Sequence, residues 1–138
     1  MTIFEGLLGT LQDGKVLDVR IGLHWTAVVV EVAGEPRCGL AATLFEREGH
    51  DHAPTVPQAG ELDQVSGREL AELALCGQPT LTSVGMAAIN ALLPRSPELY
   101  FEANAEEMIS QYGAGKRVVL VGHFPFVPRL RDRVGELV

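Results

Sequence analysis

The chain has 138 residues, of which 46% are hydrophobic and 21% charged, and its formal net charge is −7. This composition is typical of a globular protein with its own core and excludes a disordered chain. The acidic balance, without a basic face, argues against nucleic acid as a partner. We expect a cytoplasmic protein with no membrane partner, because no secretory signal is visible and every apolar run is far shorter than the ~20 residues of a membrane span.

The first third of the chain predicts a helix followed by an antiparallel meander. Residues 2–11 place apolar side chains at helical spacing and end at Asp13-Gly14. Residues 17–29 carry apolar side chains at odd positions, which is the period of a strand. We therefore expect the odd face to be buried and Gly22 to divide two strands. A turn at residues 34–36 then leads to a third strand over residues 37–44.

Residues 45–64 predict a long loop, a kind of segment that often carries function. His50 and His52 stand at alternate positions in it, so their imidazoles could share a metal ion. A structural zinc site normally needs four ligands that include closely spaced cysteines, and Cys38 and Cys76 have no near partner. A solvated loop is therefore the alternative.

The middle of the chain predicts helices, and the second of them carries candidate ligand-binding residues. Helices are expected from the Ser66–Glu69 capping box to Gly77, from Thr82 or Ser83 to Pro94, and from Asn104 to Gly113. Asn90 has apolar neighbours that indicate burial, and a buried amide needs partners. One interpretation is that three residues of this helix contact a ligand: Ser83, Gly85 and Asn90. The alternative is that Ser83 caps the helix, Gly85 permits close packing and Asn90 makes hydrogen bonds within the protein.

The last segment predicts the opening of a parallel sheet. Residues 116–121 read as a strand buried on both faces, and residues 127–134, with Pro128 in the first turn, read as a helix. Too few residues follow for us to expect a crossover and a second strand. The turn Gly122-His123-Phe124-Pro125 lies at the carboxyl end of the strand, where open α/β sheets bind ligands. It is a candidate ligand site, and a plain strand-to-helix turn is the alternative.

Two further residues have both a functional and an ordinary interpretation. Glu61, at the end of the long loop, is a candidate general base or ligand carboxylate, or simply solvated. His24, on the polar face of the meander, is a candidate metal ligand or a surface histidine.

Five stretches of the chain resemble the heavy-metal chelation proteins. They are Asp18–Val30, Arg37–Leu44, Ala59–Leu62, Ser83–Leu93 and Val121–Phe126, and the resemblance covers nearly the whole chain in order. In that family an enolase N-terminal-like domain precedes a Rossmann-like domain. The resemblance implies an α+β (α/β) fold, with the first domain over residues 1–112 and the incomplete beginning of the second over residues 113–138.

The resemblance also implies a ligand site in the crevice between the two lobes. Family members continue through a complete Rossmann-like lobe, whereas this chain stops after its first strand and helix. We therefore expect either a fragment, or a homo-oligomer or partner subunit that completes the sheet.

The preferred function is binding of a metal ion, such as a divalent heavy metal, or of a small anionic or chelator-like ligand. One alternative is an enzyme acting on a phosphorylated or carboxylated metabolite, with His123 or Glu61 as acid or base. The other is a non-catalytic assembly module that completes a sheet with a partner chain.

Overall fold

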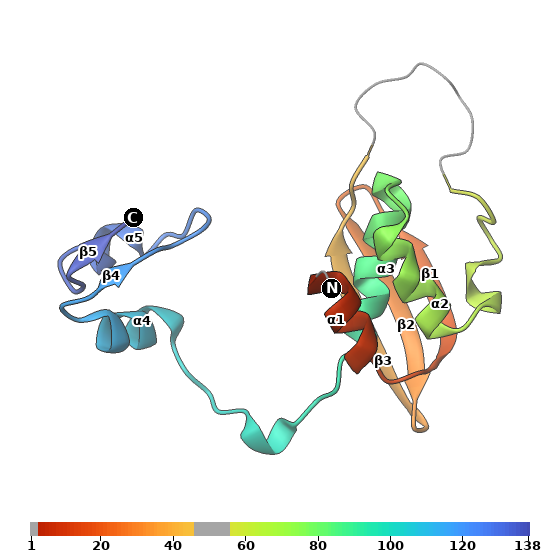
Figure 1. Ribbon diagram of the computed structural model, residues 1–138, viewed down its shortest axis with the longest axis horizontal. Helices are drawn as coiled ribbons and strands as arrows, with labels where there is room; N and C mark the ends of the chain where they lie inside the picture. Colours follow the sequence, from red (N-terminus) through yellow and green to blue (C-terminus); the bar gives the residue numbers. More distant parts are fainter. Residues whose placement is uncertain (1–2, 46–55) are drawn as a thin grey trace. The chain divides into compact units, whose positions relative to one another are not determined.

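A computed structural model describes residues 3–45 and 56–138, which form two compact units, Met1–Arg95 and Ser96–Val138 (Figure 1). The first unit contains α1 (Ile3–Thr10), β1 (Lys15–Ile21), β2 (Trp25–Val32), β3 (Glu35–Ala42), the 3₁₀ turn η1 (Leu62–Gln64), α2 (Gly67–Glu72), η2 (Leu73–Leu75) and α3 (Pro79–Leu92). The second contains η3 (Pro97–Leu99), α4 (Ala105–Gly113), β4 (Arg117–Val118), α5 (Val127–Leu130) and β5 (Glu136–Leu137). The predicted α+β class is confirmed, and the predicted domain boundary after residue 112 stays a prediction. Among the described residues, no helix has the length and apolar content that crossing a bilayer requires.

The three-stranded sheet of the first unit is an antiparallel meander in the order β1-β2-β3, as predicted. Gly22 lies in the turn between β1 and β2, where its amide donates to the Trp25 carbonyl oxygen at 2.9 Å. β3 begins at Glu35, two residues before the predicted start, because Ala33 and Gly34 alone make the turn in the positive-φ conformation.

The buried face of β2 is the opposite of the predicted one. Its core-facing side chains stand at even positions: Thr26, Val28, Val30 and Val32. Trp25 is 63% exposed. The cause is the hairpin register, because antiparallel partners share a face and Ile21 pairs with Thr26. Odd positions of β1 face the core together with even positions of β2 only after the register shift between Val16 and Asp18. The prediction therefore holds for Val19 and Ile21, which pack against the core, and is wrong for Leu17, which is exposed while Val16 is buried.

Helix α3 lies along the inner face of the sheet and contacts both β2 and β3, while α2 packs against α3 (Figure 1). It begins at Pro79, before both predicted caps, Thr82 and Ser83. Proline fits the first turn of a helix because it lacks the amide hydrogen that would be unsatisfied there. Ser83 therefore lies inside the helix and is not its cap.

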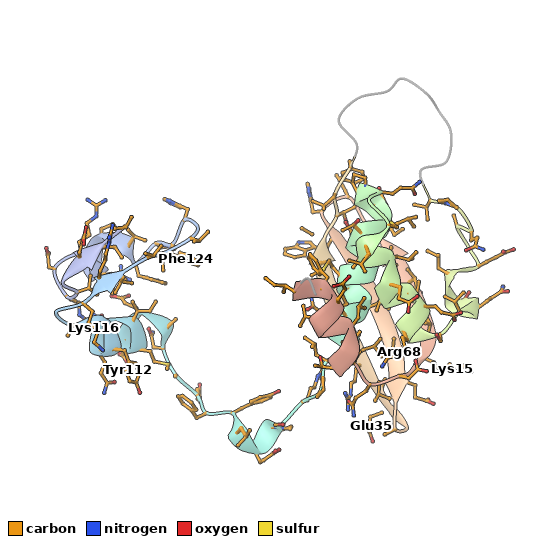
Figure 2. All side chains as sticks on the ribbon, viewed as in Figure 1. Lys15, Glu35, Arg68, Tyr112, Lys116 and Phe124 are labelled. Carbon is orange, nitrogen blue, oxygen red and sulfur yellow. The ribbon has the colours of Figure 1, made fainter. Side chains whose placement is uncertain are left out.

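Helix α2 begins with the predicted capping box and also holds α1. Ser66 Oγ accepts from the Glu69 amide at 3.2 Å, and Glu69 Oε2 accepts from the Ser66 amide at 2.8 Å. This backbone hydrogen bond from Ser66 is the main cause that lowers the pKa of Glu69. Arg68 of α2 donates to the carbonyl oxygens of Leu8 and Leu11, at 2.9 and 2.6 Å, and so ties the end of α1 to α2 (Figure 2).

In the second unit, α4 is joined to α5 by a carboxylate–guanidinium pair. Asn104 caps α4 as predicted, its side chain accepting from the Glu107 amide at 3.3 Å. Glu106 accepts two hydrogen bonds from Arg129, at 2.6 and 3.0 Å. The hydrogen bond from Arg129 is the largest cause that lowers the pKa of Glu106.

The parallel sheet of the second unit differs from the prediction in two respects. β4 comprises only Arg117–Val118 and is not buried on both faces, since Arg117 is exposed and Val118 is half-buried. Val121, in the predicted strand but beyond β4, is 90% exposed. A second strand is present, because β5 pairs with β4 in parallel. The prediction that too few residues remained was wrong because the connecting helix α5 has only four residues and each strand only two.

Candidate functional site

A cavity of the first unit lies beside the edge strand β1 and has a volume of about 400 Å³. One wall is β1, the opposite wall is the segment that leads into η1, and Phe45 and Thr80 complete the lining. The lining residues are Asp18, Val19, Ile21, Phe45, Val56, Ala59, Gly60, Leu62, Asp63 and Thr80. This volume falls in the range of pockets that hold small organic molecules.

The charged residues of this lining are both acidic. Asp18 is engaged, because its Oδ2 accepts from Arg20 Nε at 2.7 Å. Asp63 makes no hydrogen bond or ion pair with any residue in the described ranges and is exposed. The pocket therefore combines a largely apolar surface with one available carboxylate, an arrangement that favours a cationic group on an apolar body.

Helix α3 fixes the residue that precedes Phe45. Thr80 Oγ1 donates to the Leu44 carbonyl oxygen at 3.1 Å, and Ser83 Oγ accepts from the Leu44 amide at 2.9 Å. Ser83 in turn donates to the Pro79 carbonyl oxygen at 3.1 Å and is 1% exposed. Ser83 thus positions one end of the pocket lining, without belonging to that lining itself.

The other two residues predicted on this helix have packing roles. A Cβ on Gly85 would overlap the Ala74 amide nitrogen, so that glycine permits the close approach of η2. Asn90 is exposed and not buried as predicted, and its Nδ2 donates to the Leu40 carbonyl oxygen at 2.8 Å. The facing strand therefore satisfies this amide, and a ligand contact of these two residues stays a prediction.

The predicted loop and strand candidates are not gathered at one place. His24 is exposed in the turn between β1 and β2. Glu61 is exposed and lies between Gly60 and Leu62, which line the pocket, but it is not itself part of the lining. His50 and His52 lie outside the described residues. Within the described ranges, no three His, Cys, Asp or Glu side chains form a group that could hold a metal ion.

The predicted turn of the second unit forms, with Gly122 at φ +120°. Gly122 borders a small hollow of about 110 Å³ at the carboxyl ends of β4 and β5, and Arg131 is the charged residue of its lining. His123, Phe124 and Pro125 are exposed and outside that lining. The Phe124 and Phe126 rings stack with their centroids 5.4 Å apart. Ligand binding at this turn stays a prediction.

Sequence reasoning did not identify Asp63 as a candidate. The spacing of apolar residues around Asp63 does not indicate a helix or a strand that would position it, because residues 45–64 read as one loop and η1 is only a short 3₁₀ turn. The available signal was position: Asp63 follows the signature stretch Ala59–Leu62 directly.

Comparison with known proteins gives one family, and the solved structures that match include two from the DUF364 family. The model of the DUF4213 family, described as "Putative heavy-metal chelation", matches residues 4–93. Comparison with curated proteins gives no match. A DUF364-family protein of unknown function from Pyrococcus horikoshii is 25% identical, with a TM-score of 0.64, over 98% of this chain and 53% of its own. A DUF364-family protein of unknown function from Desulfitobacterium hafniense DCB-2 is 22% identical, with a TM-score of 0.68, over 98% of this chain and 54% of its own.

The chain therefore spans about half the length of both solved structures. The matched family range ends within the first unit, so the pocket beside β1 lies inside it.

Proposed function

We propose that the first unit of this chain, which belongs to the heavy-metal chelation family DUF4213, binds a heavy-metal ion carried by a small organic chelator. The observation that carries the proposal is the pocket beside β1, where the available carboxylate of Asp63 borders an apolar cavity of about 400 Å³.

The chemistry of the lining supports a metal complex as the ligand. An organic chelator has an apolar body of the kind that Val19, Ile21 and Leu62 would contact. A complexed divalent ion that keeps a net positive charge would be attracted to Asp63, and carboxylate oxygens are common metal ligands. The chelator would supply the remaining ligands of the ion.

Equilibrium dialysis against the equimolar zinc–bipyridine complex tests this proposal. The complex has an aromatic body, a positive charge and open coordination positions. We expect the chain to bind it, and Asp63→Asn to weaken binding at least tenfold, because a hydrogen bond to a charged group contributes on the order of 1.5–3 kcal/mol. Both exposed cysteines, Cys38 and Cys76, are replaced by serine in every sample so that thiols do not bind zinc.

The matched control is Glu72→Gln, which removes an exposed carboxylate of α2 that does not line the pocket. Zinc alone and bipyridine alone are dialysed in parallel and are expected to bind more weakly than the complex. Equal binding of the complex by both variants, or its failure to bind the cysteine-free parent, would overturn the proposal.

A further inference from the structure

Strand β1 presents backbone groups to the pocket that lies beside it. The Gly22 amide donates to a carbonyl oxygen of β2 at 2.9 Å, and the hydrogen-bonded pairs of an antiparallel ladder recur at every second residue. Asp18 and Arg20 therefore exchange hydrogen bonds with β2. The amide and carbonyl groups of Val19 and Ile21 point to the opposite edge of the strand. Among the residues that the structure describes, those groups of Val19 and Ile21 have no hydrogen-bond partner.

The chain itself pairs with the beginning of this edge and then leaves it. The Gly67 amide donates to the Gly14 carbonyl oxygen at 2.8 Å, beside an antiparallel bridge between the start of β1 and the segment after η1. The register shift between Val16 and Asp18 keeps Gly14 and Val19 on the same edge. Alongside Val19 the chain turns away as η1 and the segment before it, which form the opposite wall of the pocket (Figure 1). The unpaired edge therefore lies between two walls that both belong to the matched family range.

The pattern of donors and acceptors along this edge matches an extended peptide backbone. Val19 and Ile21 stand two residues apart, which is ~6.8 Å at the ~3.4 Å rise of an antiparallel strand. Each offers one N–H donor and one C=O acceptor that point the same way. An extended segment of three residues carries the same two pairs of groups on its first and third residues. A ligand without such groups would leave the edge unpaired, and an unpaired polar group that a ligand covers is costly.

From this match we infer, on the basis of the proposed function, that the chelator is peptide-like and adds to β1 as a short antiparallel strand. Residues directly opposite each other in a ladder carry their side chains on the same face. The first and third side chains of the chelator therefore lie on the face of Val19 and Ile21, both of which line the pocket. Metal-binding groups on these alternate side chains hold one ion between them, and Asp63 of the same lining supplies a further ligand.

Equilibrium dialysis against the zinc complex of the blocked peptide acetyl-His-Gly-His-amide tests this ligand class, with Cys38 and Cys76 of the protein replaced by serine. Its two imidazoles hold zinc from alternate positions, and its backbone N–H groups stay available. Methylation of both histidine backbone nitrogens removes the donors that face Val19 and Ile21, and is expected to weaken binding at least tenfold because two carbonyl oxygens stay unpaired. The matched control is methylation of the glycine nitrogen, which points away from β1 and is expected to change binding by less than about twofold.

Amide hydrogen exchange locates the contact on the protein. Saturation with the unmethylated zinc–peptide complex is expected to slow exchange of the Val19 and Ile21 amides at least tenfold more than saturation with zinc–bipyridine, which has no carbonyl oxygen to accept from them. Equal binding of the unmethylated and doubly methylated peptides, or equal exchange of these amides in the two complexes, would overturn the inference while zinc–bipyridine binding leaves the proposed function standing. Failure of both zinc complexes to bind would instead overturn the proposed function and the inference together.

Discussion

Replacement of Gly39 by alanine is expected to lower the free energy of unfolding of the first unit by about 3 kcal/mol, the upper end of the usual cost of overpacking. Gly39 lies in β3 on the face that meets α3. A Cβ built there would overlap the carbonyl oxygen of Ala87 and the amide nitrogen of Ala91. Both atoms belong to the helix backbone, so no side chain can rotate to make room. The whole helix would have to move away from the sheet.

Chemical denaturation followed by circular dichroism measures this loss. The matched control is Ala42→Val, which adds two methyl groups to the same strand at an exposed position. We expect that control to stay within about 0.5 kcal/mol of the parent, as surface substitutions usually do. If Gly39→Ala were as stable as Ala42→Val, the close contact of α3 with β3 would be wrong. The hydrogen bonds of Thr80 and Ser83 to Leu44, which position one end of the pocket lining, depend on that contact.

Gly85→Ala is expected to destabilise the first unit by about 2 kcal/mol, although alanine is intrinsically the better helix former by about 1 kcal/mol. A Cβ on Gly85 would overlap the Ala74 amide nitrogen and lie 2.7 Å from both the Ala74 Cα and the Leu73 carbonyl carbon. These are backbone atoms of η2, which is packed directly on α3. The steric cost therefore exceeds the gain in helix propensity.

Gly9→Ala in α1 is the control for this substitution, because a Cβ at Gly9 has no atom within 4 Å. The same chemical change in a helix is then expected to leave stability unchanged or to raise it by up to about 1 kcal/mol. Opposite signs for the two variants, measured in one denaturation series, support the packing of α3 on η2. Equal effects would contradict it.

Local patterns predicted the elements whose cause is local. The Ser66–Glu69 capping box, the Asn104 cap and the turn at Gly22 all appear where the sequence places them. The spacing of apolar residues in β2 did not predict which of its faces is buried, because both its odd and its even positions carry apolar side chains. The pairing of Ile21 with Thr26 across the turn decides which face meets the helices, and that register is a property of the hairpin.

The candidate site was less predictable than the fold. The predicted residues Ser83, Gly85 and Asn90 lie on one helix as expected, but their polar groups and contacts are used within the protein. The pocket instead arises where an edge strand meets an irregular segment, and the cavity between Ile21 and Leu62 depends on how two distant parts of the chain meet. The spacing of apolar residues does not predict a contact between segments that are distant in the sequence, so Asp63 was not identified as a site residue.

The location of the bound complex tests the central claim most directly. Amide resonances are recorded by NMR while the equimolar copper(II)–bipyridine complex is added, because the unpaired electron of copper broadens signals of nearby nuclei. Binding in the pocket beside β1 predicts that Val19, Ile21 and Asp63 broaden first, and that Asp63→Asn reduces the broadening at Val19 and Ile21. Broadening centred on the Gly122 turn or on His24, with the pocket residues unaffected, would contradict the claim.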